Sequence, residues 1–311
     1  MVAFVFPGQG SQTVGMGKEF YASYEKAKEI FKKADEILNF PLSSYCFEGP
    51  VDKLAATSIT QPAVLTTSIV CLSIFKSFLD IKPLLVMGHS LGEYTALVAA
   101  KAVSFEDSLR VVQKRAALME EFSKKEYTMA AVLNIDKERL LNLCKKTKFK
   151  VELANFNTEK QIVVSGSKKG IEAIKVEVEK LGGRVIFLNV SGPFHSSFMK
   201  EASLKFEDIL KDIVIKDAAI PIVSNVSAEI IKFKEDIYDS LEKHMCHPVL
   251  WQKSVLKALF IGVKIFIEFG PGKILSSLIK KTDKNVVTLS VYDNSSLKNT
   301  ISYLKENLIV S

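Results

Sequence analysis

The sequence predicts an α/β protein: a large α/β-hydrolase-like domain with a mostly parallel sheet, and a small ferredoxin-like subdomain inserted into it. The chain has 311 residues, 48% of them hydrophobic, which is enough to bury a large core. Short apolar β-rich runs alternate with helical stretches, as in a helix-covered parallel sheet. Between residues 126 and 191 the order changes to β-α-β-β-α-β, a ferredoxin-like unit. We therefore expect one domain from residues 1–125 and 192–311 and a subdomain from residues 126–191.

The first part of the chain predicts a core strand followed mainly by helices. Val2 to Phe6 is a β-rich run, and the following Pro and Gly residues break it into a loop. Ser104 is a suitable N-cap for a later helix, with Asp107 three residues on. The other elements expected here are helices over 17–38 and 60–80, the latter with Pro62 in its first turn, a strand over 84–88, and helices from about 91 and over 104–122.

The inserted unit and the last third continue with short elements. An apolar stripe at spacings of 3, 4 and 3 runs along the second helix of the insert, through Ile171, Ile174, Val178 and Leu181. Within the insert we expect strands over 128–133, 151–155, 161–165 and 184–190, and helices over 136–146 and 168–181. Beyond it we expect strands over 222–224 and 264–268, helices over 238–245 and 250–260, and one more helix after the Gly270-Pro271-Gly272 turn.

The stretch Gly88-His89-Ser90-Leu91-Gly92 fits a nucleophile elbow, in which a serine stands on a sharp turn between a strand and a helix. The crowded turn needs small residues on both sides of the serine, and the two glycines supply them. The N-terminus of the next helix favours negative charge beside Ser90. The main-chain N–H of Leu91 and the Gly8-Gln9-Gly10 loop are candidates for an oxyanion hole. The alternative is a tight turn whose serine only caps the helix.

A base is needed beside Ser90, because a serine hydroxyl is a poor nucleophile until a neighbouring imidazole takes its proton. His195 is the best placed of the four histidines, since it lies in the turn-rich stretch 191–197 where the insert returns to the large domain. This pair predicts acyl transfer. No acid is clearly placed to orient His195, although Asp107 and Asp136 both fit the chain order Ser, Asp, His of hydrolases.

Composition and motifs argue against several other functions. The net charge of +7 comes from scattered lysines without an interleaved aromatic run, which disfavours a nucleic-acid partner. A dinucleotide fingerprint fails because Thr13 stands where its third glycine should be. The four cysteines form no zinc or disulfide framework, which indicates a reducing compartment. His244, Cys246 and His247 are too closely spaced for a standard zinc site, so we expect no metal.

No uninterrupted apolar run approaches the roughly 18 residues that span a bilayer, so we expect no membrane segment. The N-terminus begins directly as a core strand, without a basic leader or a cleavage site. We therefore expect a cytoplasmic protein, or one from an organelle stroma if a transit peptide has been removed. We also expect a monomer.

Taken together, eight stretches resemble the malonyl-CoA:acyl-carrier-protein transacylases of type II fatty acid synthesis, over essentially the whole chain. Their order and approximate spacing match that family, which a stray elbow motif would not reproduce. The stretches are Phe6-Pro7-Gly8-Gln9-Gly10-Ser11-Gln12, Thr60-Gln61-Pro62-Ala63, Gly88-His89-Ser90-Leu91-Gly92-Glu93-Tyr94, Gln113-Lys114-Arg115 with Met119, Ala154-Asn155-Phe156-Asn157, Gly192-Pro193-Phe194-His195-Ser196, Pro248-Val249-Leu250-Trp251 and Gly270-Pro271-Gly272.

The resemblance implies a role for each catalytic position. Ser90 would carry the malonyl group, His195 would be its base, and the amides of Gln9 and Leu91 would form the oxyanion hole. A main-chain carbonyl, that of Leu250, would orient the histidine in place of an acid. Leucine departs from the polar side chain common there, but any residue has a carbonyl.

The resemblance also implies how the substrate is selected. Arg115 would bind the free carboxylate of malonate through a bidentate fork and so exclude acetyl-CoA; its alternative is a surface arginine near a helix C-terminus. Phe194 resembles the malonyl-selective form of the family and should crowd a 2-methyl branch. The residues expected to line or orient the pocket are Gln61, Met119, Asn155, Phe194 and Leu250.

The implied cycle is ping-pong: malonyl-CoA acylates Ser90, CoA leaves, and the phosphopantetheine thiol of acyl carrier protein takes the malonyl group, with no bound cofactor or metal. Acyl carrier proteins are acidic, which gives the positive charge of the chain a partner. The alternatives are a serine hydrolase, such as a thioesterase or patatin-like lipase, and a non-catalytic carrier-binding protein. Asp217-Ala218-Ala219 is a poor match to the Asp-Gly-Gly motif of patatins, and Arg115 has no role in cleaving neutral esters.

Overall fold

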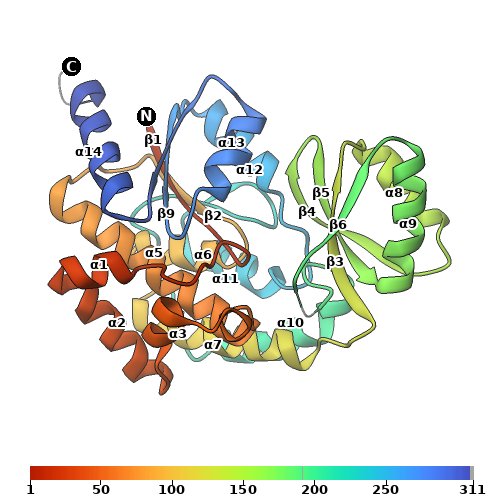
Figure 1. The fold of residues 1–311 in the computed structure, drawn as a ribbon, viewed down its shortest axis with the longest axis horizontal. Helices are drawn as coiled ribbons and strands as arrows, with labels where there is room; N and C mark the ends of the chain where they lie inside the picture. The colour runs from red at the N-terminus through yellow and green to blue at the C-terminus, as the bar shows by residue number, and fades with distance from the viewer. Residues whose placement is uncertain (191, 309–311) are drawn as a thin grey trace.

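A six-stranded sheet forms the centre of the larger of two units in the computed structural model, which describes residues 1–190 and 192–308 (Figure 1). Its strands are β1 (Val2–Phe6), β2 (Leu85–Gly88), β7 (Ile222–Val223), β8 (Ile230–Ile231), β9 (Ile265–Phe269) and β10 (Val287–Val291). They lie in the order β10-β9-β1-β2-β7-β8, and only β8 pairs antiparallel. The predicted mostly parallel sheet is confirmed.

Helices cover both faces of this sheet, as expected for parallel strands whose two faces must both be buried. The side chains of β1 alternate accordingly: Phe4 and Phe6 join one core, and Ala3 and Val5 join the other. The first core includes α2 (Glu25–Leu38), α5 (Thr57–Phe78), α6 (Gly92–Ala99) and α7 (Phe105–Glu121), and the second includes α12 (Trp251–Phe260) and α13 (Ile274–Thr282).

The predicted helix over 17–38 is wrong in its continuity. Tyr24 has extended dihedral angles (φ −133°, ψ 127°) and separates α1 (Lys18–Ser23) from α2. Its ring packs against Phe20 and Phe78, with centroids 5.9 and 6.0 Å apart. A contact with a distant residue therefore accompanies the break. The other helices of this unit are α3 (Leu42–Glu48), α4 (Val51–Leu54), the 3₁₀ helix η1 (Ser197–Met199), α10 (Lys200–Leu210), α11 (Lys234–Lys243) and α14 (Asn294–Leu308).

Helix α5 begins at Thr57, one turn before the predicted start, so Pro62 lies inside the helix and not in its first turn. The reason is a tertiary cap. The main-chain N–H and the hydroxyl of Ser58 both donate to the Glu120 carboxylate on α7, at 2.9 and 3.2 Å. This carboxylate satisfies a helix N–H that would otherwise lack a partner, so the helix extends beyond its local sequence signal.

The same helix, α5, is long and apolar enough to span a bilayer by length and composition alone. In the fold, 83% of its most apolar 18-residue window is buried, and the helix packs against α2 and α7. These features are those of a core helix.

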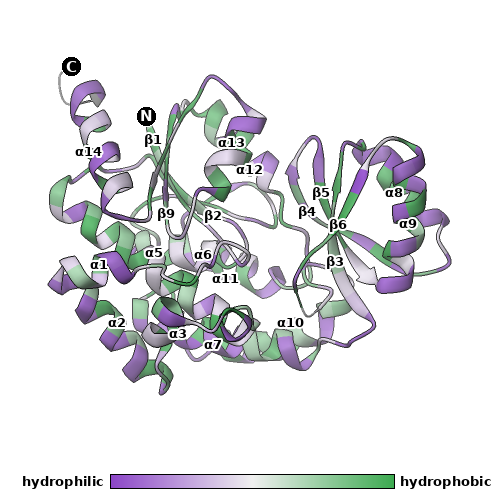
Figure 2. Cartoon of the chain, viewed as in Figure 1, coloured by the Kyte–Doolittle hydropathy of each residue, from purple (hydrophilic) through white to green (hydrophobic). Residues whose placement is uncertain are grey.

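The smaller unit is a four-stranded antiparallel sheet with two helices on one face (Figure 1). Its elements are β3 (Tyr127–Leu133), α8 (Lys137–Lys146), β4 (Val151–Thr158), β5 (Gln161–Ser167), α9 (Lys168–Lys180) and β6 (Arg184–Phe187). The sheet order β4-β5-β3-β6 confirms the ferredoxin-like unit. Figure 2 shows hydrophilic residues along the outer helices α8 and α9, while their apolar stripes form a separate core with the strands.

Some predicted bounds differ from the structure. Strand β6 ends at Phe187 and not at 190, and α11 begins at Lys234, four residues before the predicted start. The elements α3, α4, α10, α14, β8 and β10 were not predicted from the sequence. The domain limits at 126 and 191 stay a prediction, and Ser191 and residues 309–311 lie outside the described residues.

Candidate active site

Ser90 lies on the turn between β2 and α6 with a left-handed backbone, φ 51°. A non-glycine residue rarely adopts this conformation, and such strain is concentrated at functional sites. A Cβ atom at Gly88 would overlap the main chain of Gly92, and one at Gly92 would overlap the carbonyl of Phe6. The motif therefore requires glycine on both sides, as the sequence predicts.

His195 lies next to this serine. The Ser90 Oγ and His195 Nε2 atoms are 2.7 Å apart, and the histidine is 3% exposed. His195 Nδ1 is 3.0 Å from the main-chain oxygen of His244. A carbonyl can only accept, so Nδ1 carries the proton and Nε2 is free to accept the Ser90 proton. The predicted pair is brought together in the arrangement that general-base catalysis needs.

The expected orienting group for His195 is wrong. The Leu250 carbonyl accepts the N–H and the hydroxyl of Ser254 at 2.9 and 3.1 Å, because it begins helix α12. Asp107 and Asp136 are also elsewhere, since they occupy the N-terminal turns of α7 and α8. The orienting carbonyl belongs to His244, which the sequence analysis considered only as a weak metal ligand.

The environment of His195 favours its neutral form. Burial lowers the pKa of His195 well below its usual value of 6.5, and the nearby His244, Arg115 and His89 lower it further. The imidazole is therefore unprotonated at neutral pH and able to accept a proton from Ser90.

Of the two expected oxyanion donors, Leu91 belongs to the elbow and Gln9 lies in the loop after β1. The main-chain N–H groups of Gln9 and Leu91 donate to no acceptor within residues 1–190 and 192–308. The N–H of Ser90 itself is occupied, because it donates to Asn225 Oδ1 at 2.7 Å. Gly8 packs so closely on the main chain of His89 that a Cβ atom would overlap the His89 carbonyl. This contact places the Gln9 loop beside the elbow.

Arg115 is fully buried, so the alternative of a surface arginine is wrong. Its Nη1 donates to Gln61 Oε1 at 2.6 Å, and its Nη2 lies 3.4 Å from Ser90 Oγ. The guanidinium also stands over the Tyr94 ring, 5.4 Å from the centroid. Its Nε has no hydrogen-bond partner in the described part of the chain, and no carboxylate there lies within 4.0 Å of the guanidinium nitrogens.

A buried cation without a counter-ion is costly. Burial lowers the pKa of Arg115, while the Tyr94 hydroxyl and the Glu93 carboxylate act in the opposite direction. The arrangement suits an anionic ligand that enters beside Ser90 and pairs with the guanidinium.

The remaining expected pocket residues fall into two groups. Gln61 lies on the Arg115 side of the site. Its Oε1 accepts from Arg115 Nη1, and its Nε2 lies 3.3 Å from Met119 Sδ and 3.4 Å from Gln9 Oε1. Asn155 and Phe194 are buried where the smaller unit meets the site. The Phe194 carbonyl accepts from Ser165 on β5, and Asn155 pairs with Val249 in an isolated β-bridge.

Two buried residues near Ser90, Glu93 and Asn225, were not among the site residues predicted from the sequence. Glu93 is 1% exposed and Asn225 is 2% exposed. Asn225 follows β7 at the carboxyl end of the sheet, where α/β proteins bind ligands, and that position was an available signal. Glu93 directly follows the elbow, so its proximity to the serine was also available.

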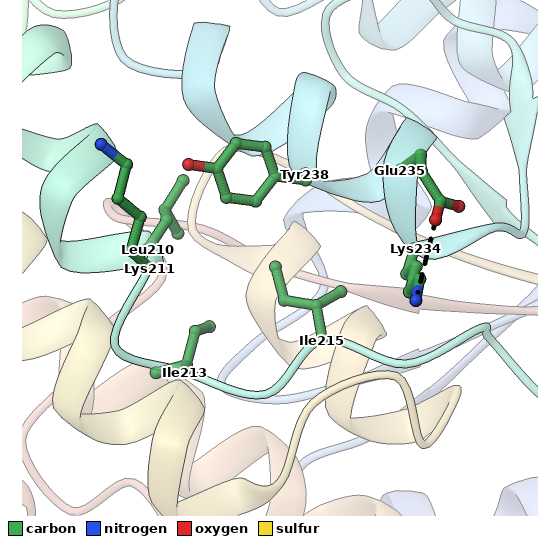
Figure 3. Close-up of a pocket in the computed structure, with 7 residues that line it drawn as sticks. All are labelled: Leu210, Lys211, Ile213, Ile215, Lys234, Glu235 and Tyr238. Carbon is green, nitrogen blue, oxygen red and sulfur yellow. Dashed lines mark ion pairs between the residues drawn. The ribbon is translucent and has the colours of Figure 1, made fainter.

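A surface hollow of about 540 Å³ lies apart from these residues, between α10, α11 and the loop that joins α10 to β7 (Figure 3). Leu210, Ile213, Ile215 and Tyr238 give it an apolar lining, and Lys234 and Glu235 form an ion pair at 3.8 Å. No nucleophile and base pair lines it among the described residues. No described group of three or more His, Cys, Asp or Glu side chains is placed to bind a metal.

The chain is thus an α/β protein with a nucleophilic serine on a strand-to-helix turn and a histidine base beside it. The chain belongs to the acyl transferase domain family, which matches residues 3–302. It is 46% identical over 310 residues to the malonyl CoA-acyl carrier protein transacylase of Bacillus subtilis (strain 168), covering 98% of each chain. The family resemblance predicted from the motifs is confirmed.

Solved structures agree with this membership. The malonyl CoA-acyl carrier protein transacylase from Clostridium perfringens Atcc 13124 matches with a TM-score of 0.94 and 39% identity, covering 99% of this chain and 98% of that chain. A structure of a type II PKS acyl-carrier protein in complex with its malonyl-transacylase matches with a TM-score of 0.94 and 32% identity, covering 97% and 99%.

Proposed function

We infer that this chain transfers the malonyl group of malonyl-CoA to the phosphopantetheine thiol of acyl carrier protein, through a malonyl ester of Ser90. The observation that carries this proposal is the buried Arg115 guanidinium, which lies 3.4 Å from Ser90 Oγ and has no described carboxylate within 4.0 Å. An acyl group that ends in a carboxylate supplies the missing partner. The names of the similar proteins support the same substrates.

In the first half-reaction, His195 Nε2 takes the proton of Ser90 while Oγ attacks the thioester carbon. The amides of Gln9 and Leu91 donate to the resulting oxyanion, and each such donor contributes about 3 kcal/mol to lowering the barrier. The C–S bond then breaks, and the CoA thiolate leaves with the proton from His195. Ser90 now carries the malonyl ester.

In the second half-reaction, the carrier thiol gives its proton to His195 and attacks the ester carbon. The C–O bond to Ser90 breaks, and Oγ recovers the proton from the imidazole. Both half-reactions balance with these groups alone, so we propose no bound cofactor and no metal.

Arg115 selects malonyl over acetyl groups in this proposal. The malonyl carboxylate forms a charge-assisted pair with the buried guanidinium. An acetyl group would leave that cation buried and unpaired, at a cost of several kcal/mol by order of magnitude. Phe194 limits room for a 2-methyl branch, and Gln61 and Met119 hold the guanidinium side of the pocket.

The partner is an acidic carrier protein. The chain carries a net charge of +7, which favours association with an acidic surface through electrostatic steering. A monomeric state and a cytoplasmic location stay predictions.

Intact-protein mass spectrometry tests the proposal directly. Wild type and Ser90→Ala are mixed with malonyl-CoA or acetyl-CoA, and holo acyl carrier protein is then added. We expect a malonyl adduct on wild type alone, and its loss to the carrier. An adduct that is lost to water at the same rate without carrier would instead indicate a serine hydrolase. Carrier binding without any adduct would indicate a non-catalytic docking protein.

A further inference from the structure

The buried Glu93 carboxylate lies behind the elbow and has no place in the half-reactions above. It projects from the first turn of α6, three residues after the nucleophile, and is 1% exposed. Its Oε2 accepts the main-chain N–H of Asn225 at 2.8 Å, and its Oε1 accepts the Ser240 hydroxyl at 3.0 Å. A buried charge is retained only with such partners.

Through Asn225, this carboxylate reaches the main chain of the nucleophile. The Asn225 side chain bridges the elbow, since its Oδ1 accepts the N–H of Ser90 and its Nδ2 donates to the Gly88 carbonyl, both at 2.7 Å. Ser90 has a left-handed backbone, which persists only when its surroundings hold it. Asn225 holds this backbone in place, and Glu93 in turn fixes the main chain of Asn225.

The carboxylate also faces His244, whose carbonyl orients His195. Glu93 Oε2 lies 3.5 Å from His244 Nε2, an electrostatic contact without hydrogen-bond geometry, and His244 Nδ1 lies 3.5 Å from Arg115 Nη2. A guanidinium has no acceptor, so the unprotonated nitrogen of His244 faces Arg115 and the N–H faces Glu93. Ser240 lies on α11, which ends just before His244. Its hydrogen bond to Glu93 therefore links this helix to the same carboxylate.

We propose that Glu93 is a positioning residue. Its carboxylate keeps Asn225 and His244 in place, and these two residues in turn position the Ser90 main chain and the His195 imidazole relative to each other. This inference rests on the proposed function. Productive geometry in such a pair is strict, because a misplacement of about 1 Å can cost on the order of 100-fold in rate.

The test is single-turnover acylation of Ser90 by malonyl-CoA, with the limiting rate constant and the half-saturating concentration measured separately. For Glu93→Ala we expect a limiting rate constant lower by about 10- to 100-fold, with less than about a threefold change in half-saturation. Glu93→Gln should recover part of the loss, to within about tenfold of wild type, because its amide can still accept from Asn225.

Glu268 provides the matched control. It is 0% exposed and accepts the main-chain N–H groups of Leu275 and Ser276, at 3.0 and 2.7 Å, at the start of α13. Glu268→Ala and Glu268→Gln should lower the melting temperature without changing the limiting rate constant of the folded fraction. If Glu93→Ala does not fold, the limiting rate constants of Glu93→Gln and Glu268→Gln are compared instead. We expect a decrease of about threefold or more in Glu93→Gln and none in Glu268→Gln.

Wild-type rates in folded Glu93 variants, or equal losses in the Glu268 variants, would overturn the inference. Failure of wild type itself to acquire a malonyl group would instead reject the proposed function.

Discussion

His195 is oriented by the main-chain oxygen of His244, 3.0 Å from its Nδ1, and not by a carboxylate. A carbonyl fixes the tautomer of the imidazole as a carboxylate would, but it adds no negative charge. With Arg115 close by, the protonated imidazole is disfavoured. The pKa of His195 is held well below 6.5, first by burial and then by the His244 ring, Arg115 and His89, while the hydrogen bond to the His244 carbonyl acts in the opposite direction. The surroundings of His195 therefore favour a neutral imidazole that can act as the base for Ser90.

Acylation of Ser90 should stay active below the pH at which a free imidazole protonates. The reaction needs neutral His195, and its pKa is lowered, so the rate should fall only at a pH well below 6.5. The measurement is kcat/KM for malonyl-CoA against pH, between about pH 4.5 and 8. An acid limb centred at or above 6.5 would contradict this expectation.

Replacing Arg115 should relax acyl selectivity. Arg115→Ala removes the cation that pairs with the malonyl carboxylate, so kcat/KM for malonyl-CoA should fall by about 100-fold or more while that for acetyl-CoA falls less. Arg115→Lys should recover little, because lysine lacks the bidentate fork. The ratio of the two kcat/KM values is the readout, and an unchanged ratio would reject the role of Arg115.

Acid should destabilise the fold through three histidines, of which His195 and His244 are buried and His89 is half-buried. Burial lowers the pKa of each. Above pH 6.5 these histidines are neutral in both the folded and the unfolded chain. Below it the unfolded chain binds protons that the folded chain does not, so stability falls with pH, by up to about 1.4 kcal/mol per pH unit for each histidine.

Urea unfolding between pH 7.5 and 5.5 measures this dependence. His89→Gln, which removes one of the three groups, should flatten the slope by about a third by the same linkage relation. An identical slope in that variant would show that His89 does not contribute.

The cap on α5 should be worth a measurable amount of stability. Glu120→Ala leaves the N–H of Ser58 without its 2.9 Å acceptor, so the free energy of unfolding should fall by about 1 kcal/mol. The neighbouring Glu121 makes an exposed ion pair with Lys205 at 2.9 Å, so Glu121→Ala is the control and should change stability by less than about 0.5 kcal/mol. Equal effects in the two variants would contradict the capping role.

Features whose causes are local could be predicted from the sequence. The strand, turn and helix around Ser90 follow from contiguous residues, because the crowded elbow accepts only glycine at Gly88 and Gly92. The ferredoxin-like order likewise follows from element types that each short segment specifies. Eight motifs in the right order were enough to indicate the family, which the comparisons confirm.

The distant groups that meet at the site could not be predicted in this way, because they come together only when the chain folds. A carbonyl has no sequence signature, since every residue carries one, so the choice of His244 over Leu250 depends on where the chain folds back. Asn225 reaches Ser90 across 135 positions, and Arg115 is buried because α7 packs against α5 and α6. Such contacts arise from long-range packing, which determines the partners of Ser90 and His195 where local propensity cannot.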